Sequence, residues 1–294
     1  MKTFPLKTLS LLSSVAFLAQ SSVAQVISDN FEVDSSANYS VVNDGTPNGT
    51  SVFGYDYVAA GIALAPNSLP GDKGGLRFTA NDSLAAVDAL TAFHNTSLTS
   101  PGYRLKVDVY MGFTGTAGTT EHGHVGVGGN GSTFNSIFTP ISGSGSFIAF
   151  TGDGGSASDY RWHLDAAHGG PTTVPNSDAS YLGHGSNNTG PFYQSLFPSG
   201  TVIGSPGNIW TTLEIDVTGN TISYLFDGQL TIQGTFTGTL NGLISLGLAD
   251  TFASSVDSGT VFTLYDNLVV TVPEPTSLAL VGLGSLAFLA RRRK

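Results

Sequence analysis

Aromatic side chains gather in the glycine-rich middle of the sequence, between residues 152 and 207. Flat aromatic rings can stack on the apolar faces of sugars, and polar neighbours can bind the hydroxyl groups. We therefore predict a sugar-binding site formed by Tyr160, Trp162, His163, Tyr181 and Tyr193. The alternative is that Trp162 belongs to a strand and points into the core.

Two carboxylates on one predicted strand make glycoside hydrolysis a candidate activity. That chemistry uses a pair of acidic side chains, about 5–5.5 Å apart in retaining enzymes. Glu214 and Asp216 are two positions apart, but Asn220 and Thr221 follow without a further glutamate. Outward-facing carboxylates on an amphipathic strand are the simpler interpretation, so we predict no catalytic residues.

Two histidines form the second short motif, Glu121-His122-Gly123-His124. In a strand their side chains would share one face, and neutral imidazoles can bind zinc or copper. No third ligand follows at a fixed spacing, so we favour solvated polar residues in a glycine-rich loop, without a metal.

Charge and cysteine content exclude several classes of function. Six of the 11 Lys and Arg residues lie within the first seven or last four positions, which leaves five against 21 Asp and Glu and a net charge of about −16. Such a surface repels phosphate backbones, so we expect no nucleic-acid partner. The chain has no cysteine, which excludes disulfides, thiol catalysis and cysteine-ligated metals.

Alternation of apolar and polar residues predicts antiparallel strands with one buried face. One face of residues 103–110 carries Tyr103, Leu105, Val107 and Val109, and one face of residues 211–217 carries Leu213, Ile215 and Val217. Thr218-Gly219-Asn220 and Asp227-Gly228 predict tight turns that join three consecutive strands.

Further strands are expected at 75–80, 125–128, 146–151, 244–249 and 261–272, whereas 84–93 is the one segment that could form a short helix. Residues 152–207 are expected to form long loops. Many short strands with frequent turns predict an all-β antiparallel sandwich, in particular a jelly roll.

The two ends of the chain resemble targeting segments. Residues 1–24 combine Lys2 and Lys7, an apolar run and a small-residue cleavage site, which predicts a secretory signal peptide. At the other end, the uncharged residues 277–290 would span roughly 21 Å as a helix, less than a hydrocarbon core of about 30 Å. This segment is a marginal membrane span, and the four cations that follow it would hold its end in the cytoplasm. We therefore expect a body of residues 25–271 between a signal peptide and a short C-terminal transmembrane helix.

The last 23 residues resemble the PEP-CTERM sorting signal of Gram-negative bacteria. The resemblance rests on three ordered elements: Pro273-Glu274-Pro275, the short apolar helix, and Arg291-Arg292-Arg293 with Lys294. It implies recognition and cleavage by an exosortase in the membrane, and sorting to the cell envelope, cell surface or extracellular matrix. A plain tail anchor is the alternative.

The body more weakly resembles concanavalin A-like and laminin-G-like sandwiches. The resemblance rests on Trp210 to Asp227-Gly228, on the closing strand 264–270 with Asp266-Asn267, and on the opening stretch 28–32. It implies that the first and last strands pair. Asp29, Glu32 and Asp266 would then come together, and such oxygen ligands suit a structural Ca²⁺; the alternative is that Asp266-Asn267 forms a turn or caps an edge.

Taken together, these patterns predict a non-catalytic, exported surface or matrix protein whose partners are the exosortase, the membrane before processing, and envelope or extracellular polysaccharide. Two alternatives remain open. One is a glycan-acting hydrolase or lyase of the concanavalin A-like fold. The other is a purely structural or adhesive component of a coat or biofilm.

Overall fold

The computed structural model describes most of the body of the chain. The described residues are 23–46, 48–82, 87–113, 121–138, 140–153, 159–182, 185, 189–251 and 259–273. One compact unit spans Gln25–Val272, and a second comprises Met1–Ala24 with Pro273–Lys294. Most of the predicted signal peptide, the C-terminal helix and the sorting residues Glu274, Pro275 and Arg291 to Arg293 lie outside the described residues. Within the described ranges, no helix is long and apolar enough to cross a membrane.

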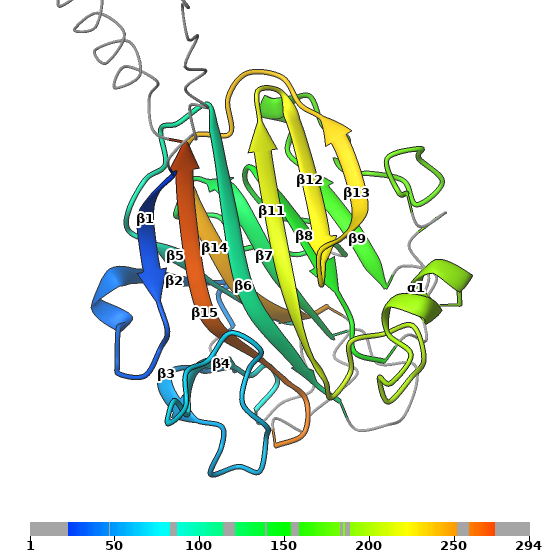
Figure 1. Cartoon of the computed structure of the whole chain (residues 1–294). Helices are drawn as coiled ribbons and strands as arrows, with labels where there is room; N and C mark the ends of the chain where they lie inside the picture. Colours follow the sequence, from blue (N-terminus) through cyan, green and yellow to red (C-terminus); the bar gives the residue numbers. More distant parts are fainter. Residues whose placement is uncertain are drawn as a thin grey trace, which may run out of the picture. The chain divides into compact units, whose positions relative to one another are not determined.

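Eight strands form one antiparallel sheet (Figure 1), in the order β13–β12–β11–β6–β15–β4–β3, with β1 paired to β15 beside this path. These strands are β1 (Val23–Asp29), β3 (Ser51–Asp56), β4 (Gly74–Phe78), β6 (Gly102–Gly112), β11 (Trp210–Thr218), β12 (Thr221–Phe226), β13 (Gln229–Thr235) and β15 (Phe262–Pro273). The pairing of β1 with β15 confirms that the first and last strands lie side by side.

Seven strands form the other sheet, in the order β10–β9–β8–β7–β14–β5–β2. They are β2 (Tyr39–Asn43), β5 (Asp88–His94), β7 (Glu121–Gly129), β8 (Ser146–Phe150), β9 (Tyr160–Leu164), β10 (Thr172–Thr173) and β14 (Leu243–Asp250). Short helical turns, η1 (Ser36–Asn38) and η2 (Ala166–His168), and the helix α1 (Pro191–Leu196) lie between strands.

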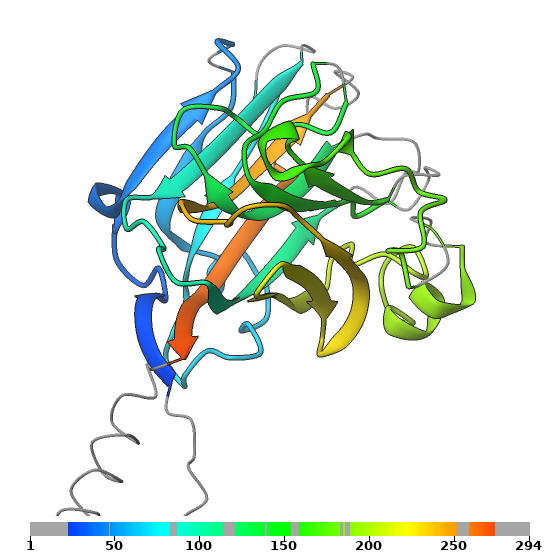
Figure 2. The same ribbon diagram turned by 90° about the horizontal axis from the view of Figure 1, so that it is seen from above.

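The two sheets pack face to face around one main hydrophobic core (Figure 2). The alternation read from the sequence explains which residues fill it, because Leu105 and Val107 of β6 and Leu213 and Ile215 of β11 are all fully buried. Both predicted turns join paired strands, β11 to β12 and β12 to β13. The predicted antiparallel β-sandwich is confirmed.

Two local predictions were wrong. The segment 84–93 does not form a helix where it is described, because Asp88–His94 is the strand β5, held between β2 and β14. The described part of the middle region also contains regular structure, namely β9, β10 and α1. In both places, pairing with neighbouring strands or packing on the core decided a structure that local sequence left ambiguous.

A long connection between β3 and β4, residues 57–72, lies across the outer face of the eight-stranded sheet, and we call it the strap. Asn67 N–H and Ser68 Oγ donate hydrogen bonds to Asp108 of β6 and Asp266 of β15, at 3.0 and 2.9 Å. Trp210 Nε1 donates to the carbonyl oxygen of Ala63 at 2.7 Å. The strap is therefore fixed to three neighbouring strands.

A polar groove on the eight-stranded sheet

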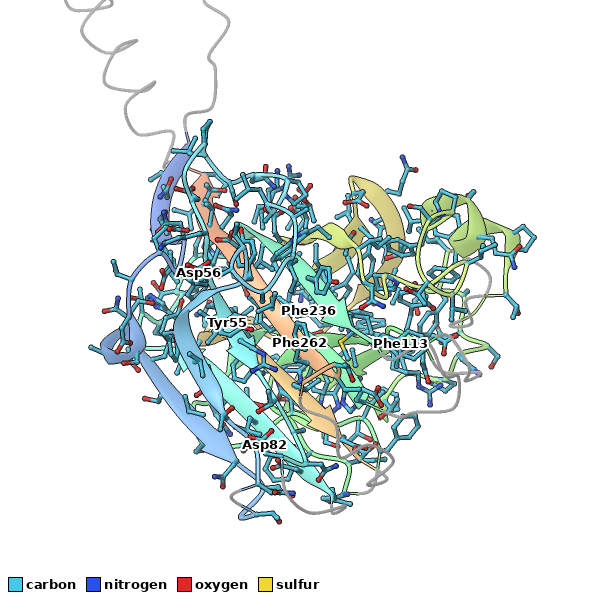
Figure 3. The ribbon with its side chains drawn as sticks, turned by 90° about the horizontal axis from the view of Figure 1, so that it is seen from below. Tyr55, Asp56, Asp82, Phe113, Phe236 and Phe262 are labelled. Carbon is cyan, nitrogen blue, oxygen red and sulfur yellow. The ribbon has the colours of Figure 1, made fainter. Side chains whose placement is uncertain are left out.

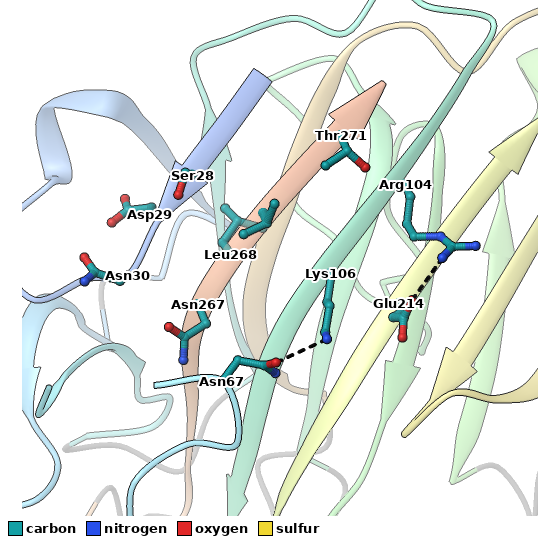
Figure 4. A pocket seen from close by; sticks show the side chains of 11 residues that line it. Ser28, Asp29, Asn30, Asn67, Arg104, Lys106, Glu214, Asn267, Leu268 and Thr271 are labelled. Carbon is teal, nitrogen blue, oxygen red and sulfur yellow. Dashed lines mark hydrogen bonds and ion pairs between the residues drawn. The ribbon is translucent and has the colours of Figure 1, made fainter. Parts of the chain in front are cut away.

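A groove of about 550 Å³ opens on the outer face of the eight-stranded sheet, over β1, β15, β6 and β11 (Figure 4). Its polar lining includes the amides of Asn30, Asn67 and Asn267 and the charged side chains of Arg104, Lys106 and Glu214. Cavities of this size are typical of small-ligand sites, and amide and charged groups can bind hydroxyl-rich molecules. This groove is the candidate functional site.

The two cations of the groove come from β6. Because Tyr103, Leu105 and Val107 point into the core, Arg104 and Lys106 must point outward, two positions apart on the same face. Two of the five basic residues of the body therefore lie side by side in one groove.

Arg104 is anchored by the neighbouring strand β11, whose residue Asp216 lies opposite it in the register. Its Nε and Nη2 donate to Asp216 Oδ2 at 3.0 and 2.7 Å, and its Nη1 lies 3.8 Å from Glu214 Oε2. Hydrogen bonding to Asp216 and the charges of both carboxylates raise the pKa of Arg104 above its usual value. The guanidinium is a fixed part of the wall.

Lys106 is bound differently, because its Nζ donates to the side-chain oxygen of Asn67 at 3.2 Å. Asn67 itself is held by Asp108, which accepts its backbone N–H and its Nδ2 at 3.0 and 2.7 Å. An ammonium group carries three protons and one is used here, so Lys106 retains capacity to bind a ligand.

A β-bulge places Asn267 at the edge of the groove. The register of β15 against β6 shifts between Asp266 and Val269, and Asn267 has a positive φ of 51°. Bulges turn a side chain away from the regular alternation. Asn267 Nδ2 thereby reaches Ser68 Oγ at 3.0 Å and Asp108 Oδ2 at 3.1 Å.

The predicted calcium ligands do not form a cluster. Asp29 accepts hydrogen bonds from Phe31 N–H and the Tyr39 hydroxyl, and Glu32 accepts two backbone N–H groups of the β4 region. Asp266 is 1 % exposed and accepts hydrogen bonds from Tyr57, Ser68 and Asn267. Among the described residues, no group of three or more acidic or histidine side chains is arranged to hold a metal ion. The correct strand pairing therefore did not bring these three carboxylates together.

The five residues predicted to bind sugar are buried, which corrects that prediction. Tyr160, Trp162, His163, Tyr181 and Tyr193 are between 0 and 4 % exposed. All but His163 belong to the main core, where Tyr160 stacks on Tyr193 with ring centres 4.2 Å apart. Of these five residues, Trp162 alone lines a second groove, of about 450 Å³. Rings packed in this way offer no free face to a sugar.

The two short motifs behave as surface and strand residues. Glu214 and Asp216 face outward, as expected, and both interact with Arg104. His122 and His124 share the outer face of β7, with ring centres 6.3 Å apart, but both are fully buried. The expectation of a solvated loop at these histidines was wrong, because residues of the 130–145 connection such as Ile137 and Phe138 pack on this face.

Sequence reasoning missed most of the groove. For Arg104 and Lys106 a signal was present, because the alternation that puts Tyr103 and Leu105 inside puts these cations outside. For Asn67 and Asn267 no signal was present, because their positions depend on the path of the strap and on a bulge.

Three comparisons place this chain among known proteins. Residues 271–294 match the PEP-CTERM protein-sorting motif. A search of curated proteins found no match. Among solved structures, the carbohydrate recognition domain of Emp47p is similar at 10 % identity over 76 % of this chain and 88 % of that one, with a TM-score of 0.44.

Two further solved structures show a similar arrangement. A Bacillus subtilis protein of unknown function with a galectin-like fold has 8 % identity over 87 % of this chain and 99 % of its own, with a TM-score of 0.44. Crh5 transglycosylase, in complex with NAG, has 11 % identity over 85 and 84 % of the two chains, with a TM-score of 0.45. Likeness at this level concerns the fold alone.

The match at residues 271–294 confirms the sorting signal predicted from Pro273, the apolar segment and the terminal arginines. This motif is independent of the sandwich, so it identifies a destination and no ligand. The chain carries a PEP-CTERM protein-sorting motif C-terminal to an antiparallel β-sandwich, which indicates an exported protein that is sorted to the cell envelope.

Proposed function

We propose that this chain is a non-catalytic glycan-binding protein of a Gram-negative-type cell surface or extracellular matrix, and that the polar groove is its binding site. The observation that carries the proposal is the groove itself. It combines a volume of about 550 Å³ with three asparagine side chains and a lysine that retains hydrogen-bonding capacity. Export and envelope sorting support a polysaccharide as the ligand, because such polymers surround a protein at that location.

Binding without hydrolysis is supported by the partners of the two outward-facing carboxylates of β11, Glu214 and Asp216. A glycosidase needs a carboxylic acid that donates a proton to the leaving oxygen. Glu214 lies 3.8 Å from the Arg104 guanidinium and Asp216 accepts two of its hydrogen bonds. Both carboxylates therefore serve to hold the Arg104 side chain in place.

The test is a binding assay on the purified full-length chain with a panel of polysaccharides, including the producer's own. We expect saturable binding to at least one polymer and no release of reducing ends. Lys106→Ala should weaken this binding about tenfold, because a hydrogen bond to a charged group contributes about 1.5 kcal/mol. Lys73→Ala is the matched control, since Lys73 pairs with Asp56 away from the groove.

Two other results would replace the proposal. Release of sugar fragments that is lost in Glu214→Gln would identify a glycan-acting enzyme. Absence of binding to every polymer, combined with self-association of the chain, would identify a structural or adhesive component.

A further inference from the structure

Three carboxylates form one row across the seven-stranded sheet, at the end where β5 and β7 begin and β14 ends. Asp250 of β14 lies opposite Asp88 of β5 on one side and opposite Glu121 of β7 on the other. All three are buried, at 1, 0 and 2 % exposure. Directly opposed residues have Cβ atoms about 4.5–5.5 Å apart, so this row gathers three acidic side chains inside the molecule.

The side chains of this row lie on the strand faces that point toward the other sheet. Leu90 of β5 and Leu248 of β14 belong to the main core, and Asp88 and Asp250 share their strand faces. Burial is costly for a carboxylate unless hydrogen bonds or positive charge compensate it. This end of the sandwich therefore differs from the groove, where carboxylates face solvent and a guanidinium.

Asn81 lies between the two aspartates and contacts both. Its backbone N–H donates to Asp88 Oδ2 at 3.3 Å, and its side-chain Nδ2 donates to Asp250 Oδ2. Asn81 is fully buried and has a positive φ of 56°, a conformation that only a few residue types adopt readily. The backbone is thus held in an unusual shape that brings an amide to the two carboxylates.

Asp88 gives the observation that points to a ligand. It is fully buried, and its second oxygen, Oδ1, has no hydrogen-bond partner within the described part of the chain. Figure 3 labels Asp82, which follows Asn81 in the chain and whose carboxylate accepts a hydrogen bond from the Thr79 hydroxyl.

We propose that Asp88 and Asp250 bind one divalent hard cation, with the side-chain oxygen of Asn81 as a third ligand. Ca²⁺ suits this set, because it accepts carboxylate, amide and water oxygens in flexible geometry. Among the described residues, no three acidic or histidine side chains are arranged to hold a metal ion. The ligands that the protein supplies would therefore be the two carboxylates and one amide oxygen, and water would complete the coordination. Asn81 Oδ1 accepts a hydrogen bond from Asn48 Nδ2 at 3.3 Å, whereas its Nδ2 faces Asp250. A half-turn of the Asn81 amide would bring its oxygen to Asp250, and the Asn48 amide would have to turn with it so that an oxygen faces the Asn81 nitrogen.

This site is distinct from the polar groove and does not depend on glycan binding. It also differs from the calcium site predicted at Asp29, Glu32 and Asp266, which belong to the eight-stranded sheet and its connections. Its role would be structural, because the cation would neutralise charge between β5, β14 and the Asn81 loop.

The experiment uses the full-length chain purified in detergent and treated with EDTA. Thermal unfolding is followed at pH 7.5 while CaCl₂ is added. We expect the Tm to rise by about 5–10 °C when Ca²⁺ reaches about 100 times its Kd, and calorimetry to give one ion per chain. Asp88→Asn and Asp250→Asn should lose this rise, and Asp88→Asn should unfold in EDTA at a Tm no lower than wild type, because a buried charge is removed.

Asp29→Asn is the matched control, since it removes a carboxylate from the calcium site predicted by sequence, and it should keep the full rise. A wild-type Tm that is independent of Ca²⁺, a rise retained in Asp88→Asn, or a rise lost in Asp29→Asn would each overturn the proposal. If the Asp88 and Asp250 variants do not fold, terbium luminescence on the wild-type chain decides. One terbium ion displaced by Ca²⁺ supports the site, and no bound terbium refutes it.

Discussion

Asp108 and Asp266 face each other across β6 and β15, and both side chains are almost fully buried. Asp108 accepts hydrogen bonds from Thr212, Asn67 and Asn267. Asp266 accepts hydrogen bonds from Tyr57, Ser68 and Asn267. Burial, together with the charge of Asp108, raises the pKa of Asp266 to about 7. The strap is thus fixed by a carboxylate that gains a proton near neutral pH.

The first prediction concerns the titration of Asp266. Because its pKa is higher in the folded chain than the ordinary value of 3.8, the folded state binds the proton more tightly. Lowering the pH from 8 to 5 should therefore stabilise the fold through this residue, by up to about 3 kcal/mol. In Asp266→Asn this contribution should be missing from urea unfolding curves measured across the same pH range.

Ser68→Ala is the control for Asp266→Asn. It removes one hydrogen bond to the carboxylate but leaves the titrating group in place. It should lower the free energy of unfolding at every pH and retain the pH dependence. Equal pH profiles for Asp266→Asn and the wild type would contradict the assignment.

Single residues also show where sequence reasoning ends. Tyr160 and Trp162 were predicted on a sugar-binding surface, although their alternation with Arg161 and His163 is that of the strand β9. The alternation correctly separates two faces, and Trp162 was weighed as a core residue for this reason. It does not say which face meets the other sheet, and on β9 the aromatic face does.

At the scale of elements, the regular strands were predictable because β6, β11 and β12 alternate apolar and polar residues and are joined or flanked by turn residues. The strap and the bulge at Asn267 were not, because both depend on contacts between residues about 160 to 200 positions apart. The same difference applies to the residues that line the groove. Its cations on β6 follow from the alternation, and its amides do not.

One contact between the sheets tests how closely the elements fit. Gly234 of β13 lies against the ring of Trp162 of β9, where an added Cβ would come within 2.1 Å of Cη2. Gly234→Ala should therefore force the indole or the edge strand to move and lower the free energy of unfolding by about 1–3 kcal/mol. Chemical denaturation measures the change, and quenching of the Trp162 fluorescence should shift with it.

Thr235→Ala is the matched control on the same edge strand, because Thr235 is exposed. It should change stability by less than about 0.5 kcal/mol. If Gly234→Ala is equally well tolerated, the two sheets are not packed as closely at this edge as the contact indicates.

At the scale of the whole molecule, two sets of buried groups act in opposite directions as the pH falls. Protonation of Asp266 raises the free energy of unfolding as the pH falls below about 7, as argued above. His124 and His163 do the reverse, because burial lowers the pKa of both. Since the unfolded chain binds protons at these histidines first, the fold loses stability as the pH falls below 6.5.

His163 allows the opposing effect to be isolated. It is 1 % exposed, stacks on Phe147 with ring centres 4.4 Å apart, and has no hydrogen-bond partner for either ring nitrogen within the described part of the chain. Burial lowers its pKa from 6.5 to about 4, against the opposing charge of Asp165. Its contribution is therefore complete above pH 6.5 and is lost between pH 6.5 and about 4.

His163→Phe should keep the stacked ring and remove this loss, which amounts to at most about 3 kcal/mol. Unfolding free energies measured between pH 8 and 4 should pass through a maximum near about pH 6–7 in the wild type, and the decline on the acid side should be shallower in the variant. A decline of the same steepness in both proteins would show that His163 already binds a proton in the folded chain. The outer face of the seven-stranded sheet would then be open to water beneath the 130–145 connection, instead of closed by it.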